Sequence, residues 1–194
     1  MRRFTLLLAL GSLSGPVLAN PLTDALRSAH GTLCFTRSYD SAWLKAHRGQ
    51  TVREMRFALT QGSKSDYPTL RMSLRGSGKP IYSYGACEWW DKGLNREVQD
   101  NAIFPSYHSG RGIGCHMMTD TTGVSAEEGG DFPVAWSDGR SIEVHLESGA
   151  TGWRDYRAKG RPAFLDVKAA DLVLRLNRAP ASACRELITR FAPH

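Results

Sequence analysis

Residues 51–61 read TVREMRFALTQ, a run in which apolar and polar side chains alternate. The apolar set, Met55, Phe57 and Leu59, would share one side of an extended strand, because successive side chains of a strand point to opposite faces. After a short turn, residues 70–75 read LRMSLR and repeat the alternation at the distance expected of a β-hairpin. The two runs predict adjacent antiparallel strands with one buried and one exposed face.

The same pattern recurs on both sides of this pair. Further strands are expected at residues 32–37, 81–90, 112–119, 132–136, 141–147, 163–167 and 172–177. Asp138-Gly139 lies between two of these runs and is typical of a tight hairpin turn. The fold class is therefore all-β, with about eight antiparallel strands. We prefer a closed barrel to an open sandwich, because closure leaves no exposed strand edge.

Short helices are expected near both ends of the chain. Residues 21–30 carry apolar side chains on one helical face, and Asp40 could cap a second, brief helix. Near the C-terminus, Ser182 is expected to cap a helix whose apolar positions recur at helical spacing. Cys184 belongs to that apolar set, so we expect it to face the core.

Residues 1–19 have the organisation of a secretory signal peptide. Two arginines precede an apolar run, and cleavage is expected between Ala19 and Asn20. The apolar run is shorter than the roughly 20 residues that cross a bilayer. We therefore expect an exported, soluble protein, periplasmic or secreted and without a transmembrane segment, in which residues 20–194 form a single domain.

The four cysteines indicate two disulfides, because an exported chain with an even number of cysteines normally oxidises them. Four cysteines allow three pairings. We favour Cys87–Cys115 and Cys34–Cys184, since the second bridge would staple the C-terminal helix to the first strand. No Cys-x-x-Cys spacing occurs, which disfavours a zinc site.

The segment from residue 82 to residue 118 concentrates aromatic, histidine and cysteine side chains. Two adjacent tryptophans on a strand face opposite sides, so one of the pair at 89 and 90 is expected to be exposed. Exposed tryptophan is enriched at binding hot spots. We expect the loop between Cys87 and Cys115 to contact a ligand or partner through Trp89, Trp90, Tyr107, His108 and Arg111.

Two alternative roles rest on other side chains. His116 and Met118 would share a strand face and, with His108, Met117 and His145, could bind copper, because imidazole and thioether suit that metal. The competing interpretation is ordinary packing of these residues. Outward-facing arginines could form a basic stripe for an acidic partner, or simply a solvated sheet face; they are Arg56, Arg71, Arg75 and Arg175.

No catalytic, phosphate-binding or nucleic-acid-binding motif is present in the sequence. Removal of residues 1–19 leaves 23 basic and 19 acidic residues, a net charge of 23 − 19 = +4, without a concentrated basic run. These features favour a non-catalytic binding protein that needs no cofactor. Its partner would be a small ligand or a periplasmic protein, and an inhibitor or immunity-type protein that acts on another protein is a competing class.

Short motifs near both ends resemble those of a group of small exported bacterial proteins with a lipocalin-like or calycin-like barrel. The motifs comprise Cys34, Arg37, Tyr39 and Asp40 near the start, and Leu174 to Leu176, Arg178, Pro180, Cys184 and Arg185 near the end. The resemblance implies a small antiparallel barrel. Residues 31–33 read Gly-Thr-Leu where lipocalins carry Gly-x-Trp.

Overall fold

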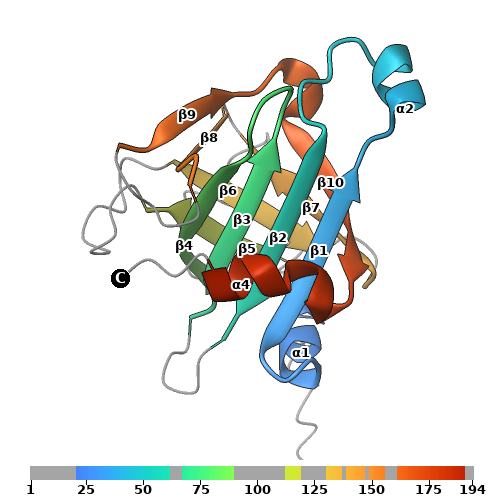
Figure 1. Cartoon of the computed structure of the whole chain (residues 1–194). Coiled ribbons are helices and arrows are strands. Elements are labelled where there is room, and N and C mark those ends of the chain that lie inside the picture. Colours follow the sequence, from blue (N-terminus) through green and yellow to red (C-terminus); the bar gives the residue numbers. More distant parts are fainter. Residues whose placement is uncertain are drawn as a thin grey trace, which may run out of the picture.

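Eight antiparallel strands form a closed barrel in the computed structural model, which describes residues 21–61, 67–89, 112–118, 130–136, 139–146, 149–155 and 161–190. The barrel strands are β1 (Thr32–Ser38), β2 (Glu54–Thr60), β3 (Thr69–Arg75), β4 (Ile81–Trp89), β5 (Gly112–Met117), β6 (Asp131–Trp136), β7 (Ser141–His145) and β10 (Val173–Ala179). They are ordered β1-β10-β7-β6-β5-β4-β3-β2 around the ring (Figure 1). The predicted barrel is confirmed.

Alternation along each strand determines which side chains fill the barrel. In β2, Met55, Phe57 and Leu59 are fully buried, as predicted, and the intervening Arg56 is half-buried on the outer face. The inward side chains of the other strands join them in one continuous apolar cluster. The interior of the barrel is therefore its hydrophobic core.

Aromatic rings meet across the barrel from strands that are far apart in the ring. Phe57 of β2 and Phe132 of β6 lie on opposite strands, yet their ring centroids are 6.5 Å apart in an edge-to-face arrangement. Phe35 of β1 and Trp136 of β6 make a similar contact at 5.9 Å. Edge-to-face aromatic pairs at these separations are in favourable contact. Side chains thus occupy the space along the barrel axis.

Helix α1 (Pro21–Ser28) closes the end of the barrel at which β1 begins. Leu22 and Leu26 are fully buried and belong to the interior cluster. The chain then turns into β1 through Gly31, whose amide donates to the Leu26 carbonyl oxygen. The expected N-terminal helix is confirmed, and its apolar face acts as a plug.

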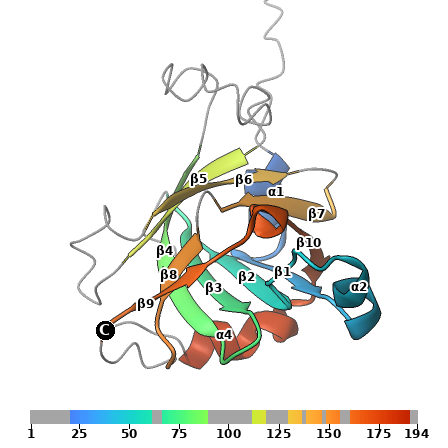
Figure 2. The same cartoon turned by 90° about the horizontal axis from the view of Figure 1, so that it is seen from above.

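The opposite end of the barrel is closed by the single-turn helix η2 (Ala169–Asp171), which lies over the ring of strands (Figure 2). Asp171 is fully buried there, and its Oδ2 accepts hydrogen bonds from the amides of Thr51 and Val52 and from the Thr51 hydroxyl, at 2.6, 3.1 and 2.5 Å. These bonds explain why β2 begins at Glu54 and not at the predicted residue 51. The amides of Thr51 and Val52 donate to this side chain instead of to a neighbouring strand.

Replacing Asp171 by alanine should lower the free energy of unfolding by about 3 kcal/mol, because three donors, one buried and two part-buried, lose their carboxylate acceptor. Urea denaturation monitored by circular dichroism measures the change. The matched control is Asp166→Ala, which removes a largely exposed carboxylate paired with Lys168 and should cost less than about 0.5 kcal/mol. Equal losses in the two variants would contradict a specific role for Asp171.

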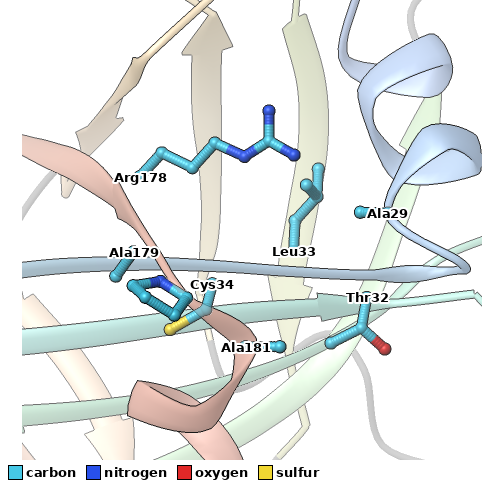
Figure 3. Close-up of a pocket in the computed structure, with 8 residues that line it drawn as sticks. Ala29, Thr32, Leu33, Cys34, Arg178, Ala179 and Ala181 are labelled. Atoms are coloured by element: carbon cyan, nitrogen blue, oxygen red, sulfur yellow. The ribbon is translucent and has the colours of Figure 1, made fainter.

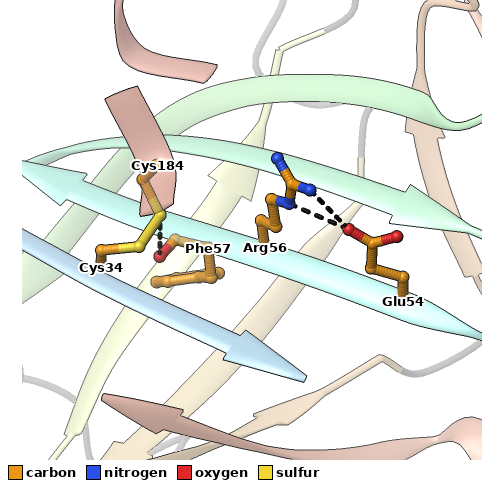
Figure 4. Close-up of a disulfide and its surroundings, with 5 residues drawn as sticks. All are labelled: Cys34, Glu54, Arg56, Phe57 and Cys184. Atoms are coloured by element: carbon orange, nitrogen blue, oxygen red, sulfur yellow. Dashed lines mark hydrogen bonds and ion pairs between the residues drawn. A yellow bond between two sulfur atoms is a disulfide. The ribbon is translucent and has the colours of Figure 1, made fainter. Parts of the chain in front are cut away.

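The C-terminal segment packs on the outside of the barrel. The 3₁₀ turn η3 (Ala181–Cys184) and helix α4 (Arg185–Arg190) contact the outer faces of β1, β2 and β3 (Figure 1). Cys184 is fully buried there and forms a disulfide with Cys34 of β1, while its sulfur lies 3.7 Å from the Phe57 carbonyl oxygen (Figure 4). The predicted cap at Ser182 is wrong: the segment begins as a 3₁₀ turn after Pro180, without a side-chain cap.

A small second sheet consists of β8 (Gly149–Gly152) and β9 (Ala163–Asp166). β8 lies between the strands expected at residues 141–147 and 163–167, where no strand was expected; its four residues include two glycines and show no alternation. Gly152 is placed so closely against β4 that an added Cβ would lie 2.5 Å from the Tyr82 carbonyl oxygen. This approach lets Trp153 bridge to Tyr82 and stack on Tyr84, with ring centroids 5.7 Å apart.

Candidate functional site

The disulfide between Cys87 and Cys115 lies at the base of the segment that we predict to be the binding loop. The two cysteines are directly opposite each other in the β4–β5 register, and both side chains are buried in the interior. The second bridge, Cys34–Cys184, is also formed, so both favoured pairings are confirmed. No free cysteine is present in the described part of the chain.

The strand directions place this segment at a defined end of the barrel. β4 ends at Trp89, whose backbone pairs with Ile113. Three residues earlier in β4, Ala86 lies in the same cross-strand row as Thr69 of β3, Thr60 of β2 and Thr32 of β1. Thr32 begins β1 beside α1, so the chain leaves β4 at the end of the barrel that α1 closes. Trp90, Tyr107, His108 and Arg111 lie outside the described residues, as does the side chain of Trp89.

The histidine and methionine pair proposed for copper shares an outer face of the barrel, as predicted. His116 is half-buried opposite Ala86, whereas Met118 packs in an outer apolar cluster with Tyr84 and Trp153. Met117 points inward and is buried. Among the described residues, no group of three or more histidine, cysteine, aspartate or glutamate side chains is placed to hold a metal ion.

Of the other two histidines considered for copper, His145 does not join this pair. His145 is on β7, which β6 separates from β5. Burial lowers the pKa of His145 below its ordinary value of 6.5, and the neighbouring Glu143 opposes this only in part. His108 lies outside the described residues. The described geometry therefore brings together His116 and Met118 alone, and Met118 is engaged in packing.

The outward arginines do not form a free basic stripe. Arg56 and Arg75 both pair with Glu54, at 2.9 and 2.6 Å (Figure 4 shows the Arg56 pair). Burial raises the pKa of Glu54, but the hydrogen bonds and charges of the two arginines outweigh it and hold that pKa below its ordinary value of 4.5. Arg71 donates to Thr60, and Arg175 donates to Ser141. These contacts favour the interpretation of a structural outer face.

A pocket of about 370 Å³ lies where α1, β1, β10 and η3 meet. It is lined by Ala29, Thr32, Leu33, Cys34, Arg178, Ala179, Pro180 and Ala181 (Figure 3). Its volume is within the range of small-ligand sites, but such sites usually hold several convergent polar groups. Here Thr32 and Arg178 are the polar side chains, and Arg178 is exposed. The pocket therefore defines no particular ligand chemistry.

An aromatic column stands at the rim of the barrel, on and beside helix α2 (Ser41–Ala46). Trp43 stacks on His47 with ring centroids 3.9 Å apart and on Tyr39 at 5.8 Å. The guanidinium carbon of Arg37 lies 4.8 Å from the Tyr39 ring centroid and 5.5 Å from that of Trp43. The Trp43 indole nitrogen donates to Gln50 at 2.8 Å.

Sequence reasoning placed the helix correctly but missed this column. Asp40 caps α2, as predicted, by accepting from the Trp43 amide at 2.7 Å. The available signal was the four-residue spacing of Tyr39, Trp43 and His47, which aligns side chains on one helical face. The four-residue spacing of these residues was therefore the signal that could have revealed the column.

Comparison of the chain with protein-family models, with curated proteins and with solved structures gave no match. Functional interpretation therefore depends on the geometry described above. No helix in the described ranges has both the length and the apolar character needed to cross a membrane.

Proposed function

We propose that this chain is an exported binding protein that engages its partner with its outer surface, through the segment between Cys87 and Cys115. The observation that carries the proposal is the contact between Phe57 and Phe132 across the barrel axis. A barrel that carries a small ligand needs an open interior, whereas here the inward side chains form one packed core. Binding at a surface is the use that this barrel supports best.

The Cys87–Cys115 disulfide, which we call the clasp, supports the choice of this segment as the binding surface. A disulfide between directly opposed residues of β4 and β5 limits the separation of the two strands from which the segment emerges. Restricting a binding segment before it meets its partner lowers the entropic cost of association. The partner class that fits this arrangement is a protein or ligand in the same compartment, including the target of an inhibitor or immunity-type protein.

Export is part of the proposal, and the two disulfides support it because they persist in oxidising compartments. The full chain, expressed in a bacterium that has a periplasm, should be recovered from that compartment with Asn20 as its first residue. N-terminal sequencing of the recovered protein provides the measurement. Recovery from the cytoplasm with residues 1–19 still attached would contradict export. We also propose that the barrel is related to the lipocalin-like and calycin-like exported proteins that its terminal motifs resemble.

Replacing Trp90 by alanine should weaken binding by about tenfold or more while leaving the melting temperature within a few degrees, as expected of a hot-spot residue. The immobilised mature protein is exposed to a periplasmic extract of the source organism, and the retained protein is quantified. The matched control is Phe164→Ala, which removes a ring that is 57% exposed on β9. Equal retention by both variants, or no retention by the unmodified protein, would count against the proposed segment.

A direct test of the filled interior uses 1-anilinonaphthalene-8-sulfonate, a fluorescent apolar ligand. We expect no saturable fluorescence increase with the folded protein, because the inward side chains of the described strands form one buried apolar cluster. Saturable binding that is lost on replacing Phe57 by a charged residue would favour an interior ligand site instead. This measurement separates two ways in which the proposal could fail. Ligand binding in the interior would contradict binding at the surface. Without interior binding, unchanged retention by the Trp90→Ala variant would contradict only the choice of segment.

A further inference from the structure

We propose that the α2 rim, defined by Arg37, Tyr39, Trp43, His47 and Arg53, is a second docking surface that accepts an acidic segment of another protein. This proposal is independent of the function proposed above. It follows the end of β1, whereas the segment between Cys87 and Cys115 leaves β4 at the opposite end of the barrel. The two surfaces can therefore be tested separately.

Helix α2 is held in place without a buried anchor. None of its residues is buried, and it projects from the barrel beyond the end of β1 (Figure 1). Trp43 remains 40% exposed even though it stacks on Tyr39 and His47. The column thus orders an exposed tryptophan in one orientation before any partner arrives. Rigid, partly exposed tryptophan, tyrosine and arginine are the residue types most enriched at binding hot spots.

The charge of the α2 rim specifies the partner. Residues 37–53 contain four arginine or lysine residues and one acidic residue, a net charge of 4 − 1 = +3. The one acid, Asp40, is occupied as the cap of α2. Two acids on adjoining elements are also engaged: Glu54 with two arginines, and Asp171 with the amides of Thr51 and Val52. A partner carboxylate would meet little competition.

Arg37 is the residue that gives this charge a defined geometry. Its guanidinium lies over the rings of Tyr39 and Trp43, and its Nε is buried without a hydrogen-bond partner in the described part of the protein. No ion pair joins Arg37 to another described residue. A guanidinium that lies over aromatic rings still has N–H groups along its edge, and that edge matches a carboxylate. Arg37 is therefore a cation set next to an apolar surface.

A protein segment fits this surface better than an extended polyanion. A polyanion gains affinity from many charges along a continuous basic track. Here Glu54 pairs with both Arg56 and Arg75 on the adjoining outer face and offsets one of their two charges, so the basic rim does not continue there as an unbroken track. An acidic segment with one apolar side chain would satisfy both parts of the site, with a carboxylate on Arg37 and the apolar group on the exposed edge of Trp43.

Selection from a displayed library of random 12-residue peptides tests the proposal with the mature, oxidised protein. We expect selected peptides to be enriched in aspartate and glutamate around an apolar residue. For a synthetic peptide of the selected sequence, Trp43→Ala and Arg37→Gln should each raise the dissociation constant at least tenfold. Replacing the acids of the peptide by their amides should have an effect of the same size. Failure to select any peptide above background would overturn the proposal.

Two matched variants provide the controls. Arg27→Gln removes one positive charge from α1 at the other end of the barrel, where the side chain is 76% exposed and pairs with Asp24, and Phe164→Ala removes an exposed ring from β9. Each should change the dissociation constant less than twofold. Losses equal to those of the rim variants would show nonspecific binding and overturn the proposal, as would heparin or phosphatidylglycerol vesicles binding the rim more tightly than the peptide. If Arg37→Gln fails to fold, as judged by circular dichroism, Trp43→Ala decides the result.

Discussion

Replacing Cys34 and Cys184 together by alanine should lower the free energy of unfolding by about 5 kcal/mol, the largest effect that we expect of any change in this protein. The bridge joins residues 150 positions apart, so it removes more freedom from the unfolded chain than any shorter cross-link would. Chemical denaturation of the oxidised variant and the oxidised unmodified protein gives the difference directly.

The location of this bridge predicts where the folded variant would first become dynamic. Cys34 and Cys184 are 1% and 0% exposed, and they join the turn η3 to β1 within the outer apolar cluster. Apart from Leu187, few apolar side chains of α4 are buried against the sheet, so the bridge supplies much of the attachment. Hydrogen exchange should therefore rise in residues 181–190 before it rises in β2 or β3.

The matched control for this experiment compares the same double variant with the unmodified protein when both are reduced, so that neither protein holds a disulfide. The two should unfold at similar denaturant concentrations, because both lack the cross-link. An oxidised variant that is as stable as the unmodified protein would show that packing alone holds η3 and α4. A uniform rise in exchange throughout the barrel would contradict a local attachment.

The barrel was predictable because the alternation of side chains has a period of two and needs no tertiary information. The run from Met55 to Leu59 and that from Leu174 to Leu176 place their leucine, methionine and phenylalanine side chains inside, as expected. β8 could not be found in the same way, since Gly149–Gly152 contains no alternation and is fixed by its contact with β4. The start of β2 depended on Asp171, which lies 120 residues away from Thr51.

The functional surface was less predictable for a related physical reason. The sequence indicated which cysteines could pair, because the helical spacing around Cys184 placed it on a buried face. It did not indicate that Arg56 and Arg75 share one carboxylate, which depends on the β2–β3 register and on Glu54 lying opposite Arg75. The column of Tyr39, Trp43 and His47 was equally hidden, because its order depends on a capped helix of six residues.

The second large effect is expected for the clasp. Replacing Cys87 by alanine and Cys115 by valine should lower the free energy of unfolding by about 3–4 kcal/mol, since the bridge closes a loop of 28 residues. The two side chains are buried in the interior, so an apolar pair avoids the further cost of placing hydroxyl groups there. Serine at both positions should cost more than the alanine–valine pair, and thermal melting of the two variants measures the difference.

The clasp also predicts a functional difference between the two bridges. Backbone pairing continues beyond it, between Glu88 and Gly114 and between Trp89 and Ile113, so removing the disulfide loosens the base of the segment without abolishing the strand pair. Partner retention should therefore fall in the Cys87 and Cys115 variant at temperatures at which the barrel is still folded. The Cys34 and Cys184 variant, assayed under equally native conditions, should retain the partner. Equal retention by both variants would show that the Cys87–Cys115 disulfide stabilises the fold but has no part in binding. Loss of retention in the Cys87 and Cys115 variant alone would show that the barrel recognises its partner through its outer surface.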